Sequence, residues 1–365
     1  MDKNLYMDIH IIQTVPPSCV NRDDTGSPKM AMYGGTMRAR VSSQAWKRAM
    51  RQMFKELFSA DFIGYRTKRL PELIAAKMYE GHEELDSEAV GKTVNDVLAL
   101  AGVKAGGDKK STLFFASSQQ IKNIAELAVK YHKDTFSKES KKKIFKADLE
   151  KAVNDNPSVD ILLFGRMAAS NVSLNYDAAA QVAHSISTHT VSNEYDYFTA
   201  VDDCGEKDTA GAGHLGTVEF NSSTLYRYAT VNIRELADNL EVNELKMAVR
   251  GFTEAFIRSM PTGRQNTFAN RTLPSLVYVA MREDQPINLA GAFERPVVAR
   301  DKGYVEESKR ILAEYAGKVY ADYVAAPSKA WAVGGTCGDL AEQVNLAELL
   351  EMIEQETGRY LGEGK

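Results

Sequence analysis

The spacing of apolar residues changes twice along this chain, from a strand pattern to a helix pattern and back. Alternate positions in residues 5–11 are apolar, which is typical of a strand with one buried face. Between about residues 69 and 156, apolar residues instead recur at helical spacing, and a sheet-like pattern returns at 159. This order indicates an α+β protein in which a helical region is inserted between two parts of a sheet domain.

Individual elements follow from the periodicity and from Gly, Pro and cap residues. We expect strands at 5–11, 159–164, 195–201, 225–233 and 275–281, and helices at 71–79, 86–100, 117–131, 140–153, 178–186, 242–260, 305–323 and from 346. Beyond the strand at 195–201, the polar segment 202–213 carries glycines, and 214–220 is again β-prone. Two such arms around a glycine-rich tip predict a long projecting hairpin.

Composition bounds the class of protein. A chain of 365 residues with 44% hydrophobic and 26% charged residues is typical of a globular protein of two or three domains. No apolar run is long enough to span a bilayer, and the start Met1-Asp2-Lys3 is unlike a signal peptide. The three cysteines are far apart, which favours a reducing compartment. We therefore expect a cytoplasmic protein without a membrane partner.

Basic residues are concentrated in one segment near the start of the chain. The protein as a whole carries 45 Lys+Arg against 49 Asp+Glu, so a segregated cationic patch indicates a local anionic ligand. The segment 29–55 contains no acidic residue and seven basic ones: Lys29, Arg38, Arg40, Lys47, Arg48, Arg51 and Lys55. A second basic cluster appears late, at Arg264, Arg295 and Arg300, and could line one groove with the first.

The second half of the basic segment predicts an amphipathic helix. Ser42 and Ser43 are good N-caps, and an apolar face that includes Trp46 and Phe54 opposes a polar face that begins at Gln44. Cations in the first turns of a helix are unfavourable next to its dipole, and a bound phosphate would reverse that penalty. The alternative is an ordinary solvated basic face.

Motifs for catalysis or metal binding have little support. The glycine pair Gly102 and Gly107 has the spacing of a phosphate loop, but Asp108 stands where that motif requires Lys. Cys204 and His214 could hold a metal with neighbouring aspartates, although a glycine-rich tip is a poor preformed site. For the Asp23-Asp24 pair, Asx turns or a salt bridge to Arg22 are favoured over magnesium. We expect no cofactor, no metal and no enzymatic activity.

At this point the sequence resembles a known family, the CasC (Cse-four) subunits of type I-E CRISPR Cascade. The resemblance rests on motifs that run in order from about residue 9 to 293. They are Pro-Ser-Cys-Val-Asn-Arg-Asp-Asp at 17–24, Tyr-Gly-Gly at 33–35, Arg-Val-Ser-Ser-Gln at 40–44, Lys-Arg-Ala-Met-Arg at 47–51, Gly-Arg-Met-Ala at 165–168, Phe-Thr-Ala-Val-Asp-Asp at 198–203, His-Leu-Gly-Thr at 214–217, Tyr-Arg-Tyr-Ala at 226–229 and Ala-Phe-Glu at 292–294.

The resemblance implies a hand-shaped fold. An RRM-like (ferredoxin-like) palm would comprise residues 1–58, 159–192 and 227–365, the last with C-terminal helices, with helical fingers at 59–158 and a β-hairpin thumb at 193–226. It also implies a ribonucleoprotein filament for antiviral defence. Several copies would polymerise along CRISPR RNA and present it to target DNA together with the large, small, end-capping and repeat-processing Cascade subunits.

Residue roles follow from the same resemblance. Residues that match family positions holding the RNA backbone are Arg22, Lys29, Arg40, Ser42, Gln44, Lys47 and Arg51, with Arg295 and Arg300 as the nearest matches to late family lysines. Residues that match base wedges are Met167, Phe198 and Leu215, and Tyr197 stands in place of a tryptophan. Two alternatives remain: a metal-dependent RNA-cleaving subunit that uses a thumb aspartate (Asp202, Asp203 or Asp208), and a filament subunit without RNA.

Overall fold

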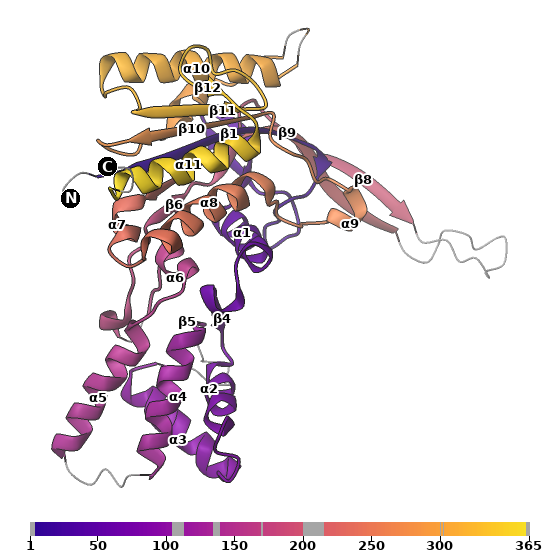
Figure 1. Ribbon diagram of the computed structural model, residues 1–365. Coiled ribbons are helices and arrows are strands. Elements are labelled where there is room, and N and C mark those ends of the chain that lie inside the picture. Colours follow the sequence, from indigo (N-terminus) through magenta and orange to yellow (C-terminus); the bar gives the residue numbers. More distant parts are fainter. Residues whose placement is uncertain are drawn as a thin grey trace, which may run out of the picture. The chain divides into compact units, whose positions relative to one another are not determined.

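The computed structural model divides the chain into two compact units (Figure 1). It describes residues 4–103, 113–133, 139–168, 171–199, 215–299, 301 and 303–362. Met1–Met53 and Ala180–Lys365 form one unit, which we call the sheet unit, and Phe54–Ala179 form the other, the helical unit. The predicted α+β character is confirmed, because one unit is built on a large sheet and the other mainly on helices.

A ten-stranded sheet organises the sheet unit, with strand order β12-β11-β10-β1-β9-β7-β3-β2 and with β6 and β8 also paired to β9. The strands are β1 (Tyr6–Ser18), β2 (Met30–Tyr33), β3 (Thr36–Val41), β6 (Ala180–Val182), β7 (Ser185–Ser187), β8 (Glu194–Thr199), β9 (Leu215–Asn232), β10 (Leu276–Arg282), β11 (Lys329–Val333) and β12 (Glu342–Gln343). The helices of this unit are α1 (Ser43–Leu57, whose last turn enters the helical unit), α7 (Ile233–Ala237), α8 (Val242–Arg258), α9 (Gln265–Phe268), η3 (Leu289–Phe293), α10 (Val305–Asp322) and α11 (Leu346–Tyr360).

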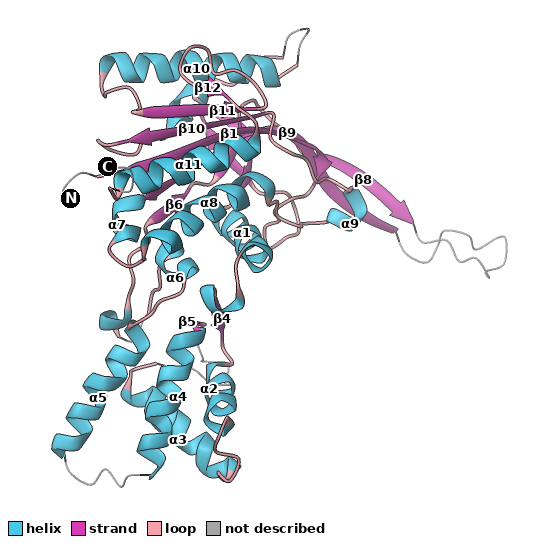
Figure 2. Cartoon of the chain, viewed as in Figure 1, coloured by secondary structure: helices cyan, strands magenta, loops and turns pink. Residues whose placement is uncertain are grey.

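Strand β1 lies in the middle of the sheet, antiparallel to both β9 and β10. Helices lie on both sides of the sheet, with α10 on one side and α8 and α1 on the other (Figure 2). The expected half-buried strand is therefore buried on both faces, including Asp8 and His10. The Asp8 carboxylate accepts a hydrogen bond from the Tyr228 hydroxyl (2.9 Å), and His10 is hydrogen-bonded to Tyr226 (2.9 Å), so both polar side chains have partners inside.

The helical unit buries its own core between α2 (Leu70–Tyr79), α3 (Ser87–Leu100), α4 (Ser118–Lys133) and α5 (Glu139–Asn154). It also contains α6 (Val159–Phe164), the one-turn helices η1 (Ala60–Phe62) and η2 (Val172–Leu174), and a small sheet of β4 (Gly64–Thr67) and β5 (Phe114–Ser117). The four helices predicted between residues 71 and 153 are confirmed to within about two residues at each end. Their strong apolar periodicity explains this agreement.

Two predicted elements have the wrong type. Residues 159–164, predicted as a strand, form α6, which ends at Gly165 with φ of 76°. A short apolar run does not distinguish a buried strand from a buried helix, and Ser158 and Gly165 were the helix-boundary signals. Residues 178–186, predicted as a helix, contain β6 and β7, because their backbones pair with β9. Helix propensity was overridden by this tertiary partner.

Candidate nucleic-acid interface

The basic segment begins with a tight hairpin, β2–β3, at the edge of the sheet. Its turn consists of Gly34 and Gly35, whose φ angles of 57° and 73° are the left-handed conformations that a two-residue hairpin of type I′ requires. Gly34 also lies directly against the Glu294 carbonyl, where a Cβ would clash. This contact holds the loop that carries exposed Arg295 against the hairpin.

Arg38 does not belong to the exposed cationic set, contrary to the sequence-based expectation. Its side chain is fully buried, and its guanidinium donates to Thr36 Oγ1 (2.9 Å), to the Ser187 carbonyl (2.9 Å) and to the Phe293 carbonyl (3.0 Å). Burial lowers the pKa of Arg38 from its ordinary value. Arg38 therefore joins β3 to β7 and to the 293–294 segment, and its donors are committed to the protein.

The amphipathic helix predicted after Ser42 is confirmed as α1. Ser42 is buried, and its hydroxyl accepts a hydrogen bond from the Ala45 N–H (3.3 Å), so it caps the helix. On the buried face, Trp46 donates to Ser185 Oγ (3.0 Å), and its ring lies 3.7 Å from the Arg227 guanidinium carbon. These contacts fix the rotation of α1. Of the polar face, Gln44 and Arg48 are exposed and Lys47 and Arg51 are partly exposed.

The loop before β2 is shaped by Asp23. Its carboxylate accepts hydrogen bonds from the Thr25 N–H (3.0 Å) and the Ser27 N–H (3.0 Å), which confirms the predicted Asx turn. Arg22 is exposed and forms an isolated β-bridge with Pro28. The loop is tied to the start of α1, because Asn21 Oδ1 accepts from the Ser42 N–H (2.9 Å).

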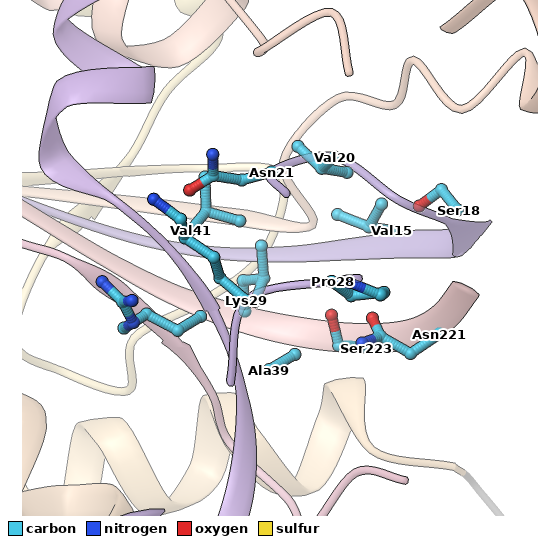
Figure 3. A pocket seen from close by; sticks show the side chains of 12 residues that line it. Val15, Ser18, Val20, Asn21, Pro28, Lys29, Ala39, Val41, Asn221 and Ser223 are labelled. Carbon is cyan, nitrogen blue, oxygen red and sulfur yellow. The ribbon is translucent and has the colours of Figure 1, made fainter. Parts of the chain in front are cut away.

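A hollow of about 290 Å³, part of it open solvent, lies between this loop, β3 and β9 (Figure 3). Lys29 and Arg40 supply its cations, and Asn21, Asn221 and Ser223 line it with further polar groups. Arg40 Nη1 lies 3.0 Å from His184 Nδ1, and since arginine only donates, that nitrogen accepts and the His184 proton is on Nε2. Burial, and then Arg40 and Lys29, lower the pKa of His184. Because Lys29 and Arg40 both line the hollow, the hollow is electropositive.

A second member of the late basic cluster, Arg264, lies near the loop that carries Arg22. Gly263 lies directly against the Val20 carbonyl, which brings the Arg264 turn onto the loop that carries Arg22. Burial raises the pKa of the Cys19 thiol, and Arg264 and Arg22 both partly oppose that shift, so both guanidinium groups act on this site. Arg300 lies outside the described residues.

The predicted hairpin arms are confirmed as β8 paired with the first residues of β9, which extend away from the sheet (Figure 1). Tyr197 and Phe198 are 70% and 51% exposed. As neighbours on one strand they point to opposite faces, so they cannot act as one wedge. Leu215 begins β9 opposite Thr199. The predicted tip at 202–213, with its aspartates, Cys204 and the adjoining His214, lies outside the described residues.

Met167 belongs to the helical unit, where it is 84% exposed. The preceding Arg166 is buried and donates to the Leu174 carbonyl (2.7 Å), the Phe115 carbonyl (3.2 Å) and Asn154 Oδ1 (2.8 Å). Burial lowers the pKa of Arg166 to about 10. Arg166 thereby anchors the chain on both sides of the exposed methionine.

Within the described ranges, no group of three or more His, Cys, Asp or Glu side chains could hold a metal ion. In the same part of the chain, no helix combines the length and apolar character needed to cross a membrane. The described site thus consists of cationic, amide and hydroxyl groups together with exposed rings. Such groups can bind phosphates and stack on bases.

Comparison with known proteins agrees with this geometry. The sequence model of the family described as CT1975-like protein matches residues 7–355. The chain belongs to the CT1975-like family. A solved structure described as "CRISPR RNA-guided surveillance complex, pre-nicking" contains a similar chain with 32% identity and a TM-score of 0.81, over 96% of this chain and 100% of that one.

A second solved chain, described as "CRISPR RNA-guided surveillance complex", has 28% identity and a TM-score of 0.62, over 96% of this chain and 99% of that one. A search of curated proteins gave no match. Both structural likenesses extend over nearly the whole chain, so they include the sheet unit and the helical unit.

Three contributors to the site were not predicted from the sequence. They are His184, Asn221 and Arg227, none of which the sequence motifs assigned a role. Arg227 is fully buried between the rings of Trp46 and Phe256, without a carboxylate among its described contacts. No local sequence signal marks such a residue, because its role depends on a helix more than a hundred positions away.

Proposed function

We propose that this protein is a guide-RNA-binding backbone subunit of a CRISPR surveillance complex, which holds RNA by its sugar–phosphate backbone and presents the bases for pairing with target DNA. The observation that carries this proposal is the electropositive hollow lined by Lys29 and Arg40, in a basic segment that continues into the exposed polar face of α1. Phosphate contacts give affinity that does not depend on sequence, as a carrier of many different guides requires.

The more specific assignment rests on motifs. The blocks at 17–24, 40–51, 198–203 and 214–217 resemble the type I-E backbone subunit, with an RRM-like palm in the sheet unit. We propose on this basis that several copies polymerise along one CRISPR RNA in the cytoplasm, in contact with the other Cascade subunits. The relatives themselves are described only as chains of CRISPR RNA-guided surveillance complexes.

A charge reversal tests the RNA-binding role. Lys47→Glu combined with Arg51→Glu should abolish retention of single-stranded RNA by the full-length protein in a filter-binding assay, because two anions would face the phosphates. Lys318→Glu, on exposed α10 surface, is the matched control and should bind like the unmodified protein. Circular dichroism should be the same for all three. Unchanged affinity and salt dependence in the double variant would contradict the proposal.

We also propose that the subunit has no nuclease activity of its own. The sequence supports this, because it shows no complete motif for catalysis or metal binding, whereas hydrolytic sites of this kind need a placed metal or base. The assembled complex should leave RNA uncut in magnesium, manganese or zinc. Cleavage that disappears in an Asp203→Ala variant would instead establish the alternative, a thumb aspartate acting with a metal.

A further inference from the structure

The hairpin of β8 and β9 has two chemically different faces. Directly opposed residues in an antiparallel pair share a face, so Tyr195, opposite Glu219, and Tyr197, opposite Thr217, lie together on one of them. Phe198, opposite Gly216, lies on the other. The same alternation along β9 continues from Glu219 through Asn221, Ser223 and Leu225, which line the electropositive hollow.

Side-chain contacts confirm that the tyrosine face and the hollow are continuous. Asn221 Nδ2 donates to Asn193 Oδ1 (3.0 Å), and Asn193 Nδ2 donates to Glu219 Oε2 (3.1 Å). This chain of hydrogen bonds runs from a residue lining the hollow to the residue opposite Tyr195. A strand of RNA whose phosphates contact Lys29 and Arg40 would therefore meet the tyrosine face next.

The phenylalanine rings on one face of the hairpin are partly covered by neighbouring residues, whereas the tyrosine rings on the other face are largely exposed. The Phe198 ring lies directly on Gly216, where a Cβ would clash, so part of its apolar surface has an internal partner. On the same face, Phe220 packs against Phe268, with ring centroids 5.9 Å apart. By contrast, Tyr195 is 63% and Tyr197 70% exposed, and neither takes part in a ring contact among the described residues.

We propose that Tyr195 and Tyr197 form a clamp for a single unpaired nucleobase of the bound RNA. Residues two apart on a strand are separated by about 6.8 Å. This is roughly twice the stacking separation of about 3.4 Å in nucleic acids, so one flat base fits between the two rings and contacts both. The inference rests on the proposed function and extends it to a residue, Tyr195, outside the expected set of contacts.

Charge also favours a base over a phosphate at this place. Glu219 is directly opposite Tyr195, and its carboxylate would repel a phosphate, whereas a neutral base stacked on the rings carries no such penalty. Stacking on tyrosine is tolerant of sequence, because every base has a π-face. The clamp therefore suits a protein that must hold guides of any sequence.

The test uses the full-length protein, freed of RNA at high salt, and single-stranded RNA containing 2-aminopurine, whose fluorescence falls when it stacks on a ring. Tyr195→Ala should weaken binding about 5- to 150-fold, from the usual contribution of a base–aromatic stack, and should abolish quenching at one register position. Tyr195→Phe should keep both. Tyr323→Ala removes another exposed tyrosine, 84% exposed at the end of α10, and should change neither.

Two further measurements separate the clamp from simpler explanations. Because no phosphate contact is lost, Tyr195→Ala should leave the slope of log affinity against log salt unchanged. If both rings hold one base, the double variant Tyr195→Ala/Tyr197→Ala should be non-additive, whereas independent stacks would add. Additive effects, or a Tyr195→Ala variant that binds like Tyr323→Ala, would overturn the clamp.

The proposed function can fail separately. If Lys47→Glu/Arg51→Glu and Tyr195→Ala all bind RNA like the unmodified protein, both proposals are wrong. If only the charge reversal abolishes binding, the basic groove stands and the clamp does not.

Discussion

Arg38 and Arg40 lie two residues apart on β3, but replacing each with Met should have a different effect. Arg38→Met should lower the stability of the fold, whereas Arg40→Met should change the salt dependence of RNA binding. Arg38→Met removes four hydrogen bonds at 2.9–3.2 Å and leaves the Ser187, Phe293 and Glu294 carbonyls without that donor. Each buried acceptor left unpaired costs about 1–3 kcal/mol, and relief of the buried charge offsets part of the sum. We expect a net loss of about 2–4 kcal/mol in the free energy of unfolding.

Arg40→Met should instead cost little stability, because the Arg40 side chain is partly exposed at the hollow. It should lower the salt slope of RNA binding by about 0.7, the value for one phosphate contact on a single strand. For Arg38→Met, the slope should be unchanged, since its donors already bond to the protein.

Urea unfolding followed by tryptophan fluorescence measures the stability difference. Both tryptophans, Trp46 and Trp331, are buried in the sheet unit, so their emission reports that unit. Filter binding over a series of salt concentrations gives the slopes. An Arg38→Met variant with unchanged stability and a reduced slope would refute the interior role of Arg38 and restore it to the RNA-binding surface.

Two other predictions concern the core and the hairpin. Burial raises the pKa of Asp8 to about 6, so the folded protein holds this proton more tightly than the unfolded chain does. The stability that Asp8 contributes is therefore fully present below about pH 4 and is lost as the pH rises through 6. Asp8→Asn should therefore remove about 3 kcal/mol of pH dependence between pH 4 and 7 in urea titrations, and an identical pH profile would count against it. Phe198→Ala with Leu215→Ala should leave the monomer folded but blur the repeating base exposure that chemical probing detects along the bound guide. A pattern unaffected by the double variant would show that these residues do not separate bases.

The sequence was sufficient wherever local chemistry determines structure. The α1 helix, its cap at Ser42 and the Gly34-Gly35 turn each follow from residues within a few positions. It was insufficient where a distant partner decides. The segment 178–186 became two strands because β9 offers backbone partners, and no pattern within the segment reveals β9.

The candidate site shows the same division. Strand alternation places Arg38 and Arg40 on the same face, and their roles differ because the Ser187 carbonyl and the 293–294 segment bind the guanidinium of Arg38. The Arg264 turn lies near Arg22 because Gly263 approaches Val20 closely, and these two positions are far apart in the sequence. Composition could indicate that the late cluster is basic, but not which parts of the chain its members lie against.

Strand β9 runs without a break from Leu215 to Asn232, so the same strand belongs to both the hairpin and the core of the sheet. Its inner half is held in register by β1, and its outer half holds β8. A single-residue insertion near Asn221 would therefore rotate the outer half of β9 so that each side chain points to the opposite face. The tyrosine face and the phenylalanine face would change places relative to the hollow, unless a β-bulge absorbed the extra residue. Insertions and deletions in this arm are thus expected to be tolerated in pairs, and an engineer who wishes to lengthen the hairpin should add two residues to each strand.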